Sequence, residues 1–132
     1  MKLLLYSILH LYSYFYPANT VYTKSTEKSE YSILKKDAKK LAQYYRMRVV
    51  RGESIASIAK LYSEDPGSAP NGGLYVGIKR GMMVPEFEKV AFSLKPNEIS
   101  EVFETEFGFH FIQLVSRKAD VLTLRHVLIT KD

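Results

Sequence analysis

The stretch GMMVPEFEKVAFSLKPNEISEVFETEFGFHFI, residues 81–112, decides the fold that the sequence predicts. Pro85 suits the first turn of a helix, where its missing N–H costs nothing, and Glu86 and Glu88 stand where the helix dipole favours acids. The apolar positions that follow at three- and four-residue spacing are Phe87, Val90, Ala91 and Leu94. We therefore expect a short helix with one apolar face, which ends at Lys95-Pro96-Asn97.

A strand pattern comes after this helix. Residues 107–114 alternate, with Phe107, Phe109, Phe111 and Gln113 on one face and Gly108, His110, Ile112 and Leu114 on the other. We expect residues 108–115 to pair with residues 99–103 in a hairpin around residues 104–107. His110 on an otherwise apolar face is the first indication of chemistry, although a lone histidine there is more often a buried residue satisfied by a neighbour.

The rest of the chain completes an α+β pattern. Helical spacing predicts a long amphipathic helix from about Ser32 to near Gly52 and a second, shorter helix over residues 53–62. The segment SEDPGSAPNGG, residues 63–73, holds two prolines and three glycines and is predicted to be a loop. Strands are expected at residues 74–78 and, from alternation in ADVLTLRHVLITKD, within residues 119–132.

The first 18 residues, MKLLLYSILHLYSYFYPA, have two interpretations. The lysine and the apolar run favour a secretory signal peptide, whereas the many tyrosines, His10 and the lack of a small-x-small cleavage site argue against one. The content of tyrosine, isoleucine and phenylalanine favours a β-strand instead. The run is too short and too rich in hydroxyl groups for a stable membrane span.

Composition narrows the function classes. The 132 residues are enough to bury one core, and 46% hydrophobic with 25% charged residues is typical of a globular protein. The formal charge of +5 comes from basic and acidic residues that are mostly interleaved, so we expect no nucleic-acid partner. The absence of cysteine excludes disulfides, thiolate nucleophiles and cysteine-based metal sites.

Four blocks together resemble the parvulin family of peptidyl-prolyl isomerases, and most of all the extracytoplasmic, tandem-domain foldases of bacteria. The blocks are SEDPGSAPNGG, GMMVPEFEKVAF, NEIS and TEFGFHFIQL, in that order, and the resemblance covers roughly residues 38–116. It implies a parvulin-like (FKBP-like) antiparallel four-stranded sheet with three to four helices. The predicted division of the chain is an N-terminal segment 1–31, a parvulin-like domain 32–118 and a strand segment 119–132.

The segment 119–132 resembles the opening strand of a further parvulin domain, with His126 in the place of a core histidine. In the family the first strand carries that histidine, and His10 in SILHLYS matches it poorly. We therefore consider that the C-terminal strand fills the place of the first strand, either within the molecule or by exchange with a second copy.

The resemblance also implies a site. Met83 and Phe87 match the floor and wall of the family's proline pocket, with Phe109 as a further substrate-binding candidate, although alternation sends it to the opposite face. The polar positions of the family's site are matched by His110, Asp65 and Thr105, with either His10 or His126 as the partner imidazole. The two imidazoles are expected to hydrogen-bond to each other, and Asp65 to act electrostatically. Neither a metal nor a cofactor is required.

Three hypotheses for function follow. The first is isomerisation of Xaa-Pro bonds in unfolded or exported proteins, by non-covalent stabilisation of the twisted amide. The second is a non-catalytic chaperone that binds peptides in the same groove. The third is a truncated product with a compromised fold. The resemblance implies a periplasmic or otherwise extracytoplasmic location.

Overall fold

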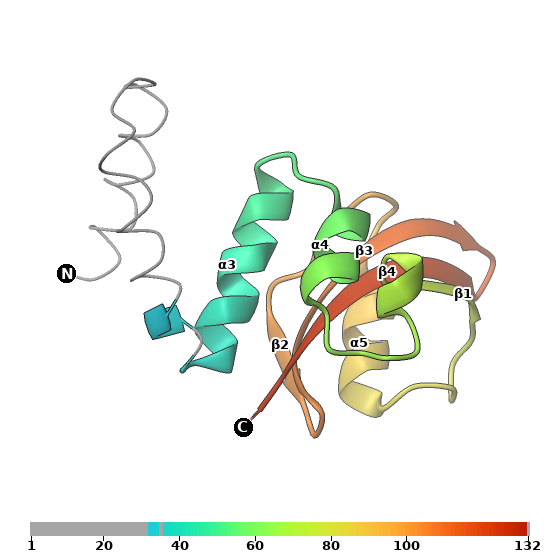
Figure 1. Ribbon diagram of the computed structural model, residues 1–132. Helices are drawn as coiled ribbons and strands as arrows, with labels where there is room; N and C mark the ends of the chain where they lie inside the picture. The colour runs from blue at the N-terminus through green and yellow to red at the C-terminus, as the bar shows by residue number, and fades with distance from the viewer. Residues whose placement is uncertain (1–31, 35, 132) are drawn as a thin grey trace. The chain divides into compact units, whose positions relative to one another are not determined.

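A computed structural model describes residues 32–34 and 36–131 (Figure 1). The elements, in chain order, are the helices α3 (Ala38–Val50) and α4 (Ile55–Tyr62), the 3-10 helix η1 (Ala69–Asn71), strand β1 (Leu74–Ile78), helix α5 (Pro85–Ser93) and strands β2 (Phe103–Thr105), β3 (Gly108–Lys118) and β4 (Val121–Thr130). Both interpretations of the N-terminal segment, and His10 with them, lie outside the described residues.

All four strands form one antiparallel sheet in the order β1-β4-β3-β2. The C-terminal strand β4 therefore lies inside the sheet, paired with β1 on one side and β3 on the other. Its long pairing with β3 runs from Gly108 opposite Thr130 to Lys118 opposite Val121. The expectation that the tail enters the sheet within the molecule is confirmed, and so is the α+β class.

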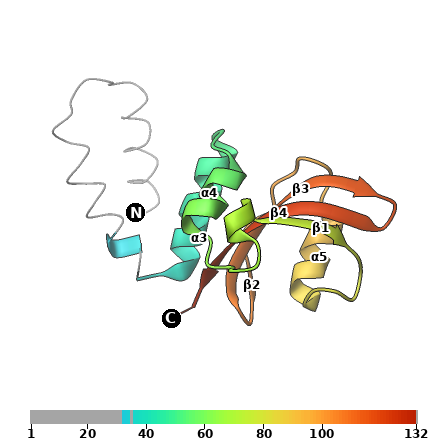
Figure 2. The same ribbon diagram turned by 45° about the vertical axis from the view of Figure 1, so that its right-hand side comes forward.

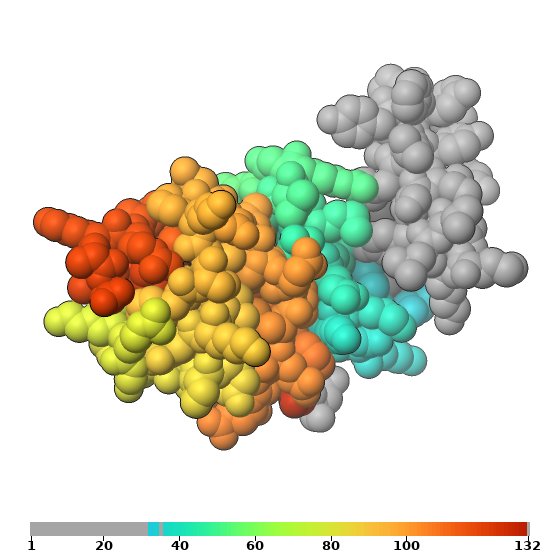
Figure 3. All heavy atoms as spheres, turned by 180° about the vertical axis from the view of Figure 1, so that it is seen from behind, coloured from blue at the N-terminus to red at the C-terminus, as the bar shows by residue number. Residues whose placement is uncertain are grey.

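Helices cover both faces of this sheet, α3 and α4 on one and α5 on the other (Figures 1 and 2). Strand alternation divides the apolar side chains between two cores. The first core joins α3 and α4 to Phe111, Val127 and Ile129, and the second joins α5 to Ile112, Leu114, Leu122 and Leu124. The predicted separation of His110 and Ile112 from Phe109 and Phe111 is confirmed. Viewed from behind, residues of α5 and β2 cover the second face (Figure 3).

The first long helix starts later than its apolar spacing predicted. Residues 32–34 have helical backbone, but α3 begins at Ala38 after an N-cap at Asp37, whose extended backbone has φ −139° and ψ 96°. The Asp37 carboxylate accepts a hydrogen bond from the Lys40 N–H at 3.1 Å. This cap satisfies a free donor of the first turn, which stabilises a helix start there and not six residues earlier.

The predicted hairpin is also displaced along the chain. Ile99 makes only an isolated bridge with Gln113, the first arm is Phe103–Thr105, and the second arm extends to Lys118. The turn is tighter than expected because the Thr105 hydroxyl accepts the Phe107 N–H at 3.2 Å. Residues before it run beside β3 as a bonded loop, in which the Ser100 N–H donates to the Ile112 carbonyl at 2.8 Å.

The loop at residues 63–73 is held against β4 by close backbone contact. The His126 N–H donates to the Gly73 carbonyl at 3.0 Å, and Gly73 has a φ of +74°. A Cβ at Gly73 would collide with the backbone of His126, so only glycine permits both the conformation and the approach. This contact brings Asp65 and Ser68 to β4.

The position of β4 predicts that its side chains contribute to stability. Leu124 is fully buried, so Leu124→Ala is expected to lower the free energy of unfolding by about 2–5 kcal/mol through lost contacts and a cavity. Val76→Ala, at a side chain that is 70% exposed, is the control and should change it by no more than about 0.5 kcal/mol. Denaturant unfolding measures the free energy of unfolding of both variants. Equal losses in the two would contradict the inclusion of β4 in the core.

Candidate active site

Four aromatic rings form a stack along the α5 face of the sheet. Tyr75 of β1 lies over His126 of β4, His126 faces His110 of β3, and His110 faces Phe103 of β2. The ring centroids are 5.1, 5.8 and 5.3 Å apart, with interplanar angles of 23°, 20° and 15°. Each ring thus comes from a different strand, in the order of the sheet.

Phe87 of α5 closes the stack from the side. Its ring meets both imidazoles edge-on, with centroid distances of 5.7 Å to His110 and 5.4 Å to His126. Phe87 is 2% exposed, His110 4% and His126 3%, so the centre of the stack is sealed from solvent. The helix face predicted from sequence thereby supplies an apolar cover for two polar rings.

Asp65 organises the polar side of the stack. Its Oδ2 accepts hydrogen bonds from the Ser68 hydroxyl at 2.5 Å and the Tyr75 hydroxyl at 2.7 Å, and lies 2.9 Å from His126 Nε2. His126 Nε2 is also 2.9 Å from the Ser68 oxygen. Since a carboxylate only accepts, these contacts place the proton of His126 on Nε2.

These hydrogen bonds shift the pKa values of two groups. The bond from His126, followed by those from Ser68 and Tyr75, holds the pKa of the Asp65 carboxyl far below its usual range. Burial, together with the bond to Asp65, raises the pKa of Tyr75 to about 12. Asp65 is therefore a fixed negative charge, and Tyr75 a fixed donor, at neutral pH.

His110 has a different polar partner. Its Nε2 lies 2.6 Å from the Thr105 hydroxyl oxygen, at the start of the tight turn. Burial, and next the proximity of His126, lower the pKa of His110 to about 4, although Asp65 acts in the opposite direction. The His110 ring is thus neutral at physiological pH.

The two imidazoles meet face to face and do not hydrogen-bond to each other, which corrects one expectation. Each Nε2 is directed to a different partner, and Nδ1 of His110 and Nδ1 of His126 are buried with no hydrogen-bonding partner among the described residues. The reason is strand geometry: the rings sit on adjacent strands with their planes nearly parallel, so they stack instead of meeting edge to edge.

The structure brings most of the expected residues together. Asp65, Thr105, His110 and His126 form the polar cluster, with Phe87 against it. Met83 is half-buried and packs against the α5 core, in the turn before the helix. Phe109 lies on the opposite face, among the α3 and α4 side chains, because strand alternation directs it away from His110. His10 lies outside the described residues.

Two participants were missed from sequence. Ser68 is fully buried and bridges Asp65 to His126, and Tyr75 both stacks on His126 and donates to Asp65. A signal for Tyr75 was its place in the predicted strand directly after the loop that carries Asp65. Ser68 has no local signal, since serine is common in proline- and glycine-rich loops.

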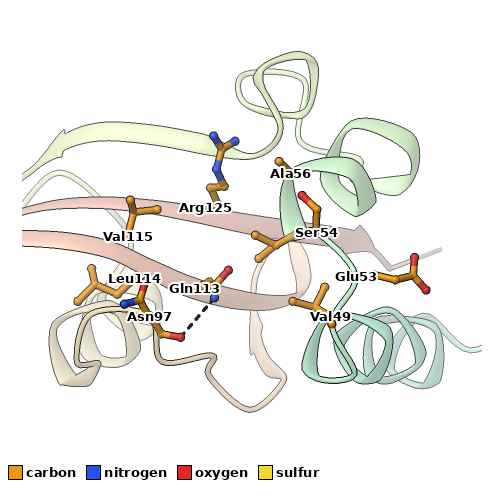
Figure 4. A pocket seen from close by; sticks show the side chains of 11 residues that line it. Val49, Glu53, Ser54, Ala56, Asn97, Gln113, Leu114, Val115 and Arg125 are labelled. Atoms are coloured by element: carbon orange, nitrogen blue, oxygen red, sulfur yellow. Dashed lines mark hydrogen bonds between the residues drawn. The ribbon is translucent and has the colours of Figure 1, made fainter.

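A pocket of about 410 Å³ opens on the other face of the sheet (Figure 4). It lies where α3 is joined to α4, and its floor includes Gln113, whose amide donates to the Asn97 carbonyl at 3.3 Å. Arg125, next to His126 in sequence, also lines it, and successive strand residues point to opposite faces. This pocket is therefore separate from the ring stack.

Other kinds of site receive no support within residues 32–34 and 36–131. That part of the chain contains no group of three or more histidine or acidic side chains placed to hold a metal ion. Its helices are also too short or too polar to cross a bilayer.

Comparison with known proteins gives concordant matches. Residues 22–116 match the family model described as "Rotamase: PPIC-type PPIASE domain". The chain is 42% identical over 86 residues to "Foldase protein PrsA" of Geobacillus sp. (strain WCH70), covering 65% of this chain and 31% of that protein. It is 38% identical over 78 residues to "Chaperone SurA" of Nitrosococcus oceani, covering 59% of this chain and 18% of that protein.

A solved structure has a fold similar to that of this chain. The crystal structure of the peptidylprolyl isomerase PrsA from Bacillus cereus superimposes with a TM-score of 0.58 at 41% identity, covering 61% of this chain and 31% of that one. The predicted parvulin-like fold is confirmed. The chain spans less than a third of the length of each of these three relatives.

The buried His110 predicts a specific loss of stability in mild acid. In the unfolded chain its imidazole takes up a proton near its ordinary pKa of 6.5, whereas the folded protein resists protonation until about pH 4. The unfolded state binds more protons in this window, so the free energy of unfolding is expected to fall as pH drops from 6.5 to about 4. Asp65 adds a further loss only below its ordinary pKa of 3.8.

His110→Gln tests this assignment. Denaturant unfolding at a series of pH values should show a smaller slope for the variant than for the parent between pH 6.5 and about 4. The difference between the two proteins above pH 7 gives the cost of the substitution itself. Parallel curves for parent and variant across the window would contradict a depressed pKa at His110.

Proposed function

The chain belongs to the family of PPIC-type PPIase (rotamase) domains, and from this premise we propose that it is a peptidyl-prolyl cis-trans isomerase. Its substrates would be Xaa-Pro bonds in unfolded or exported polypeptides. The observation that carries the proposal is the cluster of Asp65, His126, His110 and Thr105 beneath Phe87, which the 63–73 loop, strands β4, β3 and β2, and helix α5 bring together.

The chemistry needs no bond to be broken. Rotation about an Xaa-Pro bond passes through a twisted amide that has lost resonance, against a barrier of about 18–20 kcal/mol. A catalyst must bind that twisted form better than the planar one, and each 1.36 kcal/mol or so of preference gives about a tenfold higher rate. An apolar surface for the prolyl ring next to a fixed charge meets this requirement.

Each part of the cluster has a role in this proposal. The half-buried Met83 would receive the prolyl ring at the outer side of the α5 core, which contains the buried Phe87. The fixed negative charge of Asp65, held by Tyr75 and Ser68, would act on the amide electrostatically and through His126. His110 stays neutral and, with Thr105, keeps the strand and turn in place.

We also place the protein outside the cytoplasm. The support is its sequence similarity to bacterial proteins called foldase and chaperone. Unfolded polypeptides in transit would then be its substrates. Fractionation of cells that produce the chain tests this, and recovery with cytoplasmic markers alone would exclude the location.

A second candidate function is a chaperone that binds peptides without isomerising them. The observation that favours it is the closure of the stack: the imidazoles and Phe87 are almost fully buried. A peptide would then contact only the outer edge of the ring stack. Such contact favours binding of an extended chain over tight binding of a single twisted amide. The two candidates differ in rate enhancement and not in binding.

A protease-coupled assay of a prolyl peptide, paired with binding of a permanently unfolded, proline-containing protein, separates them. As an isomerase, the parent accelerates cis-to-trans conversion, and Asp65→Asn is expected to lower kcat/KM by about ten- to a hundredfold because it removes the fixed charge. Gln43→Ala, at an exposed position of α3, is the control and should keep full activity.

Thermal melting of each variant shows whether a lost rate reflects a lost fold. A cooperative transition for the parent also removes the earlier hypothesis of a compromised fold. If the parent binds the unfolded protein but gives no rate enhancement, the chaperone function replaces the isomerase.

A further inference from the structure

The short connection between β3 and β4 bears on how two copies of this chain can associate. We propose that this chain exchanges β4 with a second copy of itself, so that the ring stack of each copy receives His126 from the other. Only residues 119 and 120 join β4 to the described chain that precedes it, because Lys118 already pairs with Val121. All other contacts of β4 with the fold are non-covalent.

The turn at this connection is strained. Ala119 has a φ of +52°, a left-handed conformation that costs a residue with a Cβ roughly 1–2 kcal/mol. Two-residue hairpin turns of this kind are normally built from glycine, asparagine or aspartate at the position of positive φ. Opening the turn into extended backbone would relieve that strain, and short strained hinges are those that favour strand exchange.

The register of the hairpin carries over to a symmetric pair. If residues 108–130 form one continuous strand, Lys118 of one copy pairs with Val121 of the other, as it does within the monomer. Ala119 of one copy then lies opposite Asp120 of the other, and the ladder continues through the former turn. Each residue pair then occurs twice between the two copies, with the roles of the copies interchanged, as in a closed twofold dimer.

Exchange also keeps the contacts that build the site. The pairing of β4 with β1, the Gly73 contact with His126 and the bonds from Asp65 re-form with the incoming strand unchanged. Ala119 and Asp120 are both exposed, and the end of the β3–β4 hairpin projects at the periphery of the molecule (Figure 3). The balance between monomer and dimer therefore depends on turn strain and protein concentration.

Substitutions at the hinge test the role of the turn. Each protein is refolded at concentrations up to about 1 mM and sized by chromatography with light scattering. Ala119→Val disfavours positive φ and favours extended backbone, so it should raise the dimer fraction, whereas Ala119→Gly should weaken dimerisation by about tenfold or more. Ser116→Val and Ser116→Gly, at an exposed strand position nearby, are matched controls expected to leave the ratio unchanged.

A crosslink tests whether the dimer arises by exchange. The chain has no cysteine, and Ser116 lies opposite Thr123, so Ser116→Cys with Thr123→Cys can form a disulfide across β3 and β4. After oxidation and denaturation without reductant, the dimer fraction should run as a covalent dimer and the monomer fraction as a single chain. These readouts do not depend on isomerase activity.

Two results would overturn the proposal. One is that the parent and Ala119→Val both remain monomeric throughout the concentration range. The other is a dimer whose disulfides all lie within single chains, since a dimer formed through any other surface keeps β3 and β4 of one copy together.

Discussion

Pairing of β4 on both of its edges is the constraint on which the rest of this structure depends. Among the strands that the structure describes, β1 pairs with β4 alone. β4 also supplies side chains to both cores, Val127 and Ile129 to one and Leu122 and Leu124 to the other. It also holds the loop at residues 63–73 through the bond from His126 to Gly73. Without β4, β1 would be separated from β3, and Asp65 would lose its contact with the imidazole of His126.

The electrostatics of the cluster follow from this placement. His126 and His110 are neighbours because their strands are neighbours, and two adjacent buried imidazoles cannot both become positively charged at low cost. Asp65 makes the two rings unequal, since of the two imidazoles its carboxylate is hydrogen-bonded only to that of His126. One ring is therefore coupled to a negative charge, while the other, with its lowered pKa, remains neutral beside a hydroxyl. Two chemically identical side chains thus have different hydrogen-bonding partners.

Local patterns in the sequence predicted the local structure well. Pro85 begins α5, residues 74–78 form β1, and alternation correctly assigned His110 and Phe109 to opposite faces. Predictions failed where a side chain overrides a periodicity, as when Asp37 caps α3 or Thr105 tightens the turn. Contacts between distant residues, such as Tyr75 with Asp65 and the stacking of the two histidines, depend on strand order, which periodicity does not specify. From the sequence, His126 could be predicted as the imidazole partner of His110 only as one of two alternatives. Choosing between His10 and His126 requires knowing which segment pairs with β3.

The buried nitrogen atoms of the two histidines indicate that stability is not what this cluster optimises. Within residues 32–34 and 36–131, Nδ1 of each ring has no hydrogen-bonding partner, and an unsatisfied buried polar atom costs about 1–3 kcal/mol. Phenylalanine or leucine in the same places would fill the α5 core without that cost, as Phe87 and Phe103 do beside them. Buried polar groups that reduce stability are concentrated at functional sites, where the fold around them supplies the compensation. Here the compensation comes from the close-packed layers on both faces of the sheet, so a strand that supplies side chains to both cores also carries a buried imidazole. Stability and chemistry are therefore coupled through β4, and any change that loosens this strand acts on both at once.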